Sequence, residues 1–128
     1  MIEQTTRKVT VYFDGNKTPK GTSCSYVLID EETGRQKEET VKLPDETTVP
    51  EAEYNGLIVA LESFKNEKIT DTQIDAYGDS QLVIKQIKGE WECKKPELRV
   101  LRSRARNLLH NFAGWKINWV PRENNRAK

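Results

Sequence analysis

The stretch Val9-Thr10-Val11-Tyr12-Phe13-Asp14-Gly15-Asn16 decides the fold. It has the residue pattern of a β-strand, and an aspartate follows that pattern directly. Its valines and its phenylalanine recur at every second position, which is the period of a strand with at least one buried face. Gly15 and Asn16 are turn-forming residues, so Asp14 is expected to close the strand at the rim of a sheet, where side chains can meet a ligand. Taken alone, Asp-Gly-Asn also suits an ordinary turn, and the rest of the chain must decide.

The length and composition are those of one globular domain, residues 1–128. The chain is long enough for a single core and too short for two ordinary domains. Hydrophobic residues make up 35% and charged residues 32%, which is typical of a well-solvated folded protein rather than a disordered tail. No apolar run approaches the roughly 18 residues of a membrane span, and the first residues lack the apolar segment of a signal peptide. We expect a monomeric, cytoplasmic protein without membrane contact.

The cysteines and the charge pattern narrow the functional classes. Cys24, Cys93 and the single His110 do not have the spacing of a zinc site, so free thiols are expected. The net charge of +1 excludes a global basic field. Six basic residues against one acid nevertheless fall within residues 94–106. These residues suit either a helix face exposed to solvent or a surface that binds a polyanion. The polyanion would be one whose chemistry needs a metal ion.

The remaining patterns predict a β-β-β-α-β-α-α-β order. Thr48-Val49-Pro50-Glu51 has the form of a capping box that opens a helix, with proline in the first turn. Residues 17–21 are expected to form a hairpin loop, and the polar third strand is expected to be an exposed edge. The later strands follow helical crossovers, which favours parallel pairing in a mixed sheet flanked by helices. After the first, the predicted strands are Ser23–Asp30, Arg35–Leu43, Gln73–Tyr77 and Trp115–Val120, and the predicted helices run to Lys65, to Lys88 and from Pro96 to Phe112.

Glu53 is unusual because it lies on the apolar stripe of the first helix, in register with Leu57, Ala60 and Phe64. Burying an unpaired carboxylate costs several kcal/mol or forces its protonation, so Glu53 is expected to have a partner. The alternative is a glutamate near the helix start that reaches water and is favoured by the helix dipole.

Asp79 follows the fourth predicted strand by two residues, as Asp14 ends the first. If these strands are parallel neighbours, both carboxylates lie at one rim, where open α/β sheets bind ligands. Asp79 or Ser80 could otherwise be the N-cap of the next helix. Three carboxylates with no arginine between them repel one another, and a divalent cation with oxygen ligands relieves this. Mg²⁺ suits such a site, with Mn²⁺ as a substitute. Two ions would support phosphodiester cleavage.

Four motifs then follow one another along nearly the whole chain. They are Tyr-Phe-Asp-Gly at 12–15, Glu-Ala-Glu-Tyr-Asn-Gly-Leu at 51–57, Tyr-Gly-Asp-Ser-Gln-Leu-Val at 77–83 and Trp-Val-Pro-Arg-Glu-Asn-Asn at 119–125. In this order and placement they resemble type 1 ribonuclease H, in the compact form without a basic protrusion. The resemblance implies a five-stranded mixed α/β sheet in the order 3-2-1-4-5, with strand 2 antiparallel to the others. It also implies Mg²⁺-dependent endonucleolytic cleavage of the RNA strand of an RNA/DNA hybrid, leaving 3′-hydroxyl and 5′-phosphate ends.

Carried over residue by residue, the resemblance makes Asp14, Glu53 and Asp79 the catalytic and metal-binding acids. The family usually ends its last motif as Asn-x-x-Ala-Asp, which places the fourth acid at Lys128, and an amine cannot bind Mg²⁺. Either the acid lies beyond a truncated chain end, or this protein lacks it. Val49-Pro50 also stands where many members carry paired asparagines. The candidates for nucleic-acid contact are Gly15, Asn16, Ser80, Lys94, Lys95, Arg122 and Asn124.

Two alternatives remain open at this point. The absent fourth acid would also suit a non-catalytic hybrid-binding domain of the same fold. Another nuclease of the same superfold, such as a junction resolvase, is not excluded by the fold alone. Trp91 is interpreted either as a backbone contact or as a loop residue tucked against the core, and Arg122 as a residue that handles product.

Overall fold

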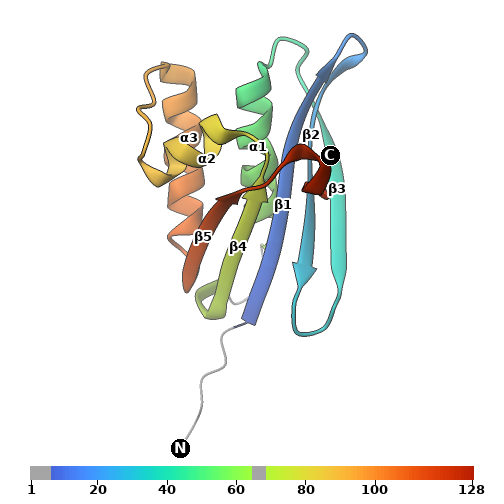
Figure 1. Ribbon diagram of the computed structural model, residues 1–128, viewed down its shortest axis with the longest axis vertical. Helices are drawn as coiled ribbons and strands as arrows, with labels where there is room; N and C mark the ends of the chain where they lie inside the picture. The colour runs from blue at the N-terminus through green and yellow to red at the C-terminus, as the bar shows by residue number, and fades with distance from the viewer. Residues whose placement is uncertain (1–6, 65–68) are drawn as a thin grey trace, which may run out of the picture.

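The strand that contains Asp14 is the middle of a five-stranded sheet with the order β3-β2-β1-β4-β5 (Figure 1). The structure is a computed structural model that describes residues 7–64 and 69–128. β2 is antiparallel to β1 and β3, whereas β4 is parallel to β1 and β5. The predicted mixed sheet is therefore confirmed in order and direction. The strands are β1 (Arg7–Thr18), β2 (Gly21–Asp30), β3 (Gln36–Leu43), β4 (Thr72–Gly78) and β5 (Gly114–Trp119).

β1 is longer than its sequence predicts. It does not close at Asp14, because its pairing with β2 continues to Thr18 opposite Gly21. The predicted hairpin between the first two strands is present, but its turn is confined to Pro19 and Lys20 and does not span residues 17–21. The parallel pairing with β4 ends at Tyr12, so the second half of β1 is paired along one edge alone. Gly15 and Asn16 are thus strand residues and not a turn, because the backbone hydrogen bonds with β2 hold them extended.

Three helices follow the predicted order: α1 (Val49–Glu62), α2 (Gln81–Lys88) and α3 (Pro96–Leu109). The capping box of α1 is confirmed, since the Thr48 side chain accepts from the Glu51 N–H and the Glu51 carboxylate accepts from the Thr48 N–H. α1 ends earlier than expected, and Lys65 lies outside the described residues. α3 ends at Leu109 rather than Phe112, with His110 as its exposed C-cap.

The helices cover one face of the sheet and enclose the core with it (Figure 1). α1 packs on β1 and β2, and α3 packs on α1. The alternation of β1 is confirmed: Val9, Val11 and Phe13 are buried in this core. β3 is an exposed edge, as predicted.

Two further features concern the chain as a whole. Cys24 and Cys93, both in the described residues, are free thiols, as expected. Within residues 7–64 and 69–128, no helix has the length and apolar character needed to cross a membrane.

Candidate metal centre

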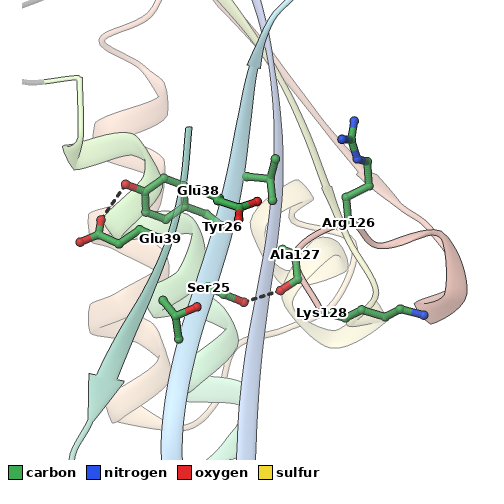
Figure 2. A pocket seen from close by; sticks show the side chains of 9 residues that line it. Ser25, Tyr26, Glu38, Glu39, Arg126, Ala127 and Lys128 are labelled. Carbon is green, nitrogen blue, oxygen red and sulfur yellow. Dashed lines mark hydrogen bonds between the residues drawn. The ribbon is translucent and has the colours of Figure 1, made fainter. Parts of the chain in front are cut away.

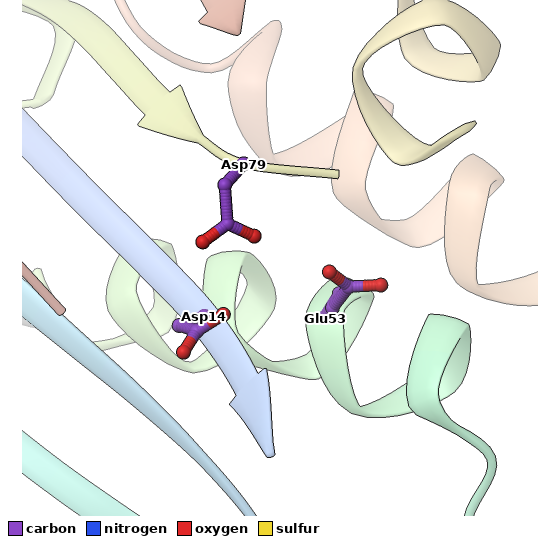
Figure 3. Close-up of side chains that lie close together, drawn as sticks. All are labelled: Asp14, Glu53 and Asp79. Carbon is purple, nitrogen blue, oxygen red and sulfur yellow. The ribbon is translucent and has the colours of Figure 1, made fainter. Parts of the chain in front are cut away.

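Asp14, Glu53 and Asp79 converge from three different elements (Figure 3). Asp14 lies on β1, Glu53 lies in the first half of α1, and Asp79 directly follows β4. One carboxylate oxygen from each residue lies within 4.8 Å of the other two. Asp14 is buried at 3% exposure, and the other two are half-buried. The predicted convergence of these side chains is therefore found in the structure.

Close contact between β1 and α1 brings the first two acids together. A Cβ atom added to Gly15 would lie 2.3 Å from the backbone nitrogen of Glu53. On the facing helix, a Cβ added to Gly56 would lie 2.7 Å from the carbonyl oxygen of Asp14. Only glycine allows backbones to approach this closely, so the two glycines let α1 lie directly on the strand beside Asp14. Gly15 therefore has a packing role that its sequence context, Asp-Gly-Asn, does not reveal.

The turn after β4 presents the third acid. Ser80, and not Asp79, is the N-cap of α2, because its hydroxyl accepts from the Val83 N–H at 3.3 Å. This leaves the carboxylate of Asp79 free to face the other two acids. The indole N–H of Trp119 donates to the Asp79 carbonyl at 3.1 Å, which ties the turn to the end of β5.

Burial and mutual repulsion make the cluster electrostatically strained. Burial, reinforced by the Asp79 carboxylate, raises the pKa of Asp14 from 3.8 to about 6. Burial and then Asp79 likewise raise the pKa of Glu53 from 4.5 to about 7, although a hydrogen bond with the Ser80 side chain partly opposes this shift. The surroundings thus bring the pKa values of Asp14 and Glu53 close to neutral pH, which is typical of a functional site.

An arginine partly compensates for the repulsion, contrary to the sequence-based expectation that none lies between the acids. A guanidinium nitrogen of Arg122 is 3.8 Å from Asp79 Oδ2 and 4.0 Å from Asp14 Oδ2. Its side chain is 62% exposed, so the attraction is screened by water. The expectation failed because Arg122 is far from the acids in sequence and reaches them through the loop after β5.

The donor set fits a divalent cation. Asp14 Oδ1 is buried and has no hydrogen-bond partner among the described residues, which is costly for a carboxylate oxygen. Three carboxylates offer the hard oxygen ligands that Mg²⁺ and Mn²⁺ prefer. A cation bound between them would satisfy the unpaired oxygen and remove the repulsion that raises the pKa values of Asp14 and Glu53.

Asn125 is a site residue that sequence reasoning missed. It is 1% exposed, and its amide nitrogen donates to the Phe13 carbonyl at 3.0 Å and to Asp79 Oδ2 at 3.3 Å. Its neighbour Asn124, the sequence-based candidate, is exposed. The Asn-Asn pair was a visible signal, but only the path of the chain decides which asparagine points inward.

The C-terminal segment crosses the sheet face opposite the helices and reaches β2 (Figure 1). Figure 2 shows a pocket of about 230 Å³ there, in which the Ser25 hydroxyl donates to the Ala127 carbonyl. Ser25 is the cross-strand partner of Asp14. Lys128, where the resemblance places a fourth acid, lines this pocket with an exposed ammonium side chain.

The other nucleic-acid candidates differ in exposure. Asn16 is exposed on β1 beyond Asp14, whereas Gly15 is buried. Lys94 and Lys95 are exposed before α3, and Lys94 lies 3.6 Å from Glu92. Trp91 is 44% exposed, so it is not tucked into the core. The ammonium group of Lys85 lies over its ring, 5.3 Å from the ring centre.

Comparisons with known proteins agree with this geometry. A family model described as "Reverse transcriptase-like" matches residues 12–127. Ribonuclease HI of Halobacterium salinarum is 39% identical over 122 residues, which cover 92% of this chain and 59% of that protein. The chain thus spans about three fifths of the length of this curated relative.

Solved structures of similar proteins share the fold. The crystal structure of RNase H1 from Halobacterium salinarum superposes with a TM-score of 0.78 at 38% identity, covering 94% of this chain and 91% of that chain. LC11-RNase H1, isolated from compost, gives a TM-score of 0.80 at 27% identity and covers 92% of this chain and 87% of that chain. A structure of LC11-RNase H1 in complex with RNA/DNA hybrid superposes with a TM-score of 0.77 at 24% identity, over 92% of this chain and 88% of that chain. At this identity the likeness supports the fold alone.

Proposed function

The chain belongs to the type 1 ribonuclease H family, and we propose that it is a metal-dependent endonuclease that cleaves the RNA strand of RNA/DNA hybrids. The observation that carries this proposal is the cluster of Asp14, Glu53 and Asp79 at the rim of the sheet. The similarity to a relative named Ribonuclease HI supports the choice of substrate.

The three acids would hold the cation and orient the reacting groups. Asp14, the most buried and the one with an unpaired oxygen, is the best candidate for a bridging ligand. Asp79 would be a second ligand, and Glu53 would hold one ion and orient water or the RNA 2′-hydroxyl. Mg²⁺, or Mn²⁺ in its place, would supply the Lewis-acid chemistry of phosphodiester hydrolysis, with two ions present when substrate is bound.

The surface around the acids suits a duplex recognised by shape and phosphates. Exposed Asn16 lies two residues beyond Asp14 on β1, and exposed Asn124 directly precedes Asn125. Arg122 contacts the acids from a 62% exposed position, where it could also meet a phosphate. Lys94 and Lys95 precede the basic helix α3, and such contacts bind hybrids with little regard for base sequence.

A cleavage assay on a labelled RNA/DNA hybrid tests the proposal. With Mg²⁺ or Mn²⁺, the protein should produce RNA fragments with 5′-phosphate and 3′-hydroxyl ends. Asp79→Asn should lower the rate at least about 100-fold, because a ligand charge is lost where charge develops. Asp45→Asn, which changes an exposed aspartate on the β3–α1 connection, is the matched control and should cleave normally. Unchanged cleavage by Asp79→Asn would disprove the site assignment.

The same experiment separates the alternatives. Hybrid binding without turnover at any Mn²⁺ concentration would favour a non-catalytic binding domain, for which the lysine at position 128 is the motivating observation. Preferential cleavage of a four-way DNA junction over the hybrid would favour a resolvase.

We propose further that the described residues form one domain that acts as a monomer in the cytoplasm. The sheet and the helices share one core, and the free thiols suit a reducing compartment. Light scattering coupled to size-exclusion chromatography measures the monomer mass directly, and a dimer mass would contradict this proposal.

A further inference from the structure

Asn125 joins three separate segments through a single buried amide. Its Nδ2 donates to the Phe13 carbonyl, one residue before Asp14, at 3.0 Å and to the Asp79 carboxylate at 3.3 Å. Its Oδ1 accepts from the Ala127 N–H at 3.0 Å. With 1% exposure, this side chain has no access to water that could replace those partners.

The chemistry of the two acceptors requires an amide at this position. The Phe13 carbonyl and the carboxylate of Asp79 can only accept hydrogen bonds, and an amide nitrogen offers two donors with a fixed angle between them. A hydrogen bond to a carboxylate is stronger than one between neutral groups, and it restricts the rotation of the carboxylate. Asn125 therefore couples the strand that carries Asp14 to the orientation of Asp79.

We propose that Asn125 is a positioning residue of the metal centre, which sets the orientation of Asp79 relative to Asp14. This inference rests on the proposed metal-dependent function. Residues that hydrogen-bond to a metal ligand typically change metal affinity or activity by about 10-fold to 100-fold when they are replaced. Asn125 is such a residue. Its amide nitrogen donates to Asp79, a candidate metal ligand, and to the backbone carbonyl that precedes Asp14, a second candidate ligand.

A purely structural role as an anchor of the C-terminal segment makes a different prediction. The Ser25 hydroxyl also anchors this segment, at Ala127, but among the described contacts it does not touch Asp79. Ser25→Ala therefore loosens the segment and leaves the contact between Asn125 and Asp79 in place. The two variants separate anchoring of the tail from orientation of the acid.

The experiment measures Mn²⁺ binding to the free protein by isothermal titration calorimetry, together with kcat and KM on the hybrid. Asn125→Leu should weaken Mn²⁺ binding about 10-fold and lower kcat about as much, with KM for the hybrid unchanged. Asn125→Ser, which is smaller and more tolerable to the fold, should show the same direction. Ser25→Ala should bind Mn²⁺ like the wild type.

Gln86→Leu is a matched control for lost stability. Gln86 is another buried side-chain amide that joins segments. It accepts from the Tyr54 hydroxyl at 2.8 Å and donates to the Glu92 carbonyl at 3.3 Å, and none of its described hydrogen bonds reaches Asp14, Glu53 or Asp79. The variant Gln86→Leu should lower the melting temperature and leave Mn²⁺ binding unchanged.

The outcomes separate the two proposals. Wild-type Mn²⁺ affinity in both Asn125 variants, or an equal loss in Ser25→Ala or Gln86→Leu, would overturn the role of Asn125 alone. A wild-type protein that binds Mn²⁺ but cleaves no hybrid would overturn the proposed function, and the Mn²⁺ isotherms would still decide the role of Asn125. A wild type that does not bind Mn²⁺ overturns both.

Discussion

Replacing Gly15 by alanine should damage the metal centre through the backbone, without removing any acidic group. The added Cβ would lie 2.3 Å from the Glu53 nitrogen, 2.5 Å from the Ala52 carbonyl carbon and 2.8 Å from the Ala52 Cβ. Ordinary van der Waals contact begins at about 3.4 Å, so α1 and β1 must separate by about 1 Å. Two of these neighbours are backbone atoms and the third is the Cβ of an alanine, all in the first half of α1, so none of them can rotate away.

Two magnitudes follow from this separation. Overpacking of this kind costs about 1–3 kcal/mol in the free energy of unfolding. The shift also moves Glu53 away from Asp14, and a misplacement of about 1 Å at an active site can cost about 100-fold in rate. We therefore expect Gly15→Ala to fold, to melt at a lower temperature, and to lose most hybrid cleavage and Mn²⁺ affinity together.

Urea denaturation, Mn²⁺ calorimetry and the cleavage assay measure these effects on the same preparation. Gly114→Ala is a suitable control, since its Cβ would also meet a close atom, at 2.4 Å, but that atom is the terminal oxygen of the flexible Gln73 side chain. It should cost little and leave metal binding intact. Wild-type stability and Mn²⁺ affinity in Gly15→Ala would refute the inference that glycine is needed for the contact between strand and helix.

Three further predictions concern other parts of the molecule. The folded-state pKa values of Asp14 (about 6) and Glu53 (about 7) exceed their ordinary values of 3.8 and 4.5. The folded protein then binds more protons than the unfolded chain, so the unfolding free energy in EDTA should fall as pH rises from about 4 to 7. Urea titrations should show this slope, Mn²⁺ should reduce it, and a flat profile in EDTA would contradict the prediction. Tyr54→Phe removes the buried donor to Gln86 and should cost about 1–3 kcal/mol in urea denaturation, with Mn²⁺ affinity unchanged; equal stability would show that the Gln86 carbonyl finds another partner. Arg122→Ala should raise KM for the hybrid in a salt-dependent way and change stability by less than about 1 kcal/mol, because the guanidinium is exposed; an unchanged KM at low salt would exclude a substrate contact.

Local patterns were sufficient for most of the fold. The alternation of β1, the capping box at Thr48 and the crossovers between later strands each depend on residues a few positions apart. The resemblance then supplied the strand order, which the structure confirms. The apolar stripe that includes Glu53 also predicted that a carboxylate there needs a partner. The structure places Asp14 and Asp79 beside it, which repel it and raise its pKa, so the partner that this cluster calls for is a cation shared by the three acids.

The end of β1 could not be judged from its own residues. Asp-Gly-Asn has the composition of a turn, yet the ladder to β2 continues to Thr18. Hydrogen bonds with a neighbouring strand outweigh a local turn preference, because each extended residue gains a paired backbone group. The requirement for glycine at position 15 arises from the approach of α1, which no neighbouring residue signals.

The sequence by itself therefore determined which acids this protein brings together and on which elements they stand. The tertiary structure alone decided how they are held: the contact of Gly15 with α1, the approach of Arg122 to two carboxylates, and the choice of Asn125 over Asn124. The physical reason is the range of the interactions. Periodicity and capping act within a few residues, whereas the amide of Asn125 meets the Phe13 carbonyl across 112 positions of the chain. Such a contact exists only once the sheet has formed and the last segment has crossed it.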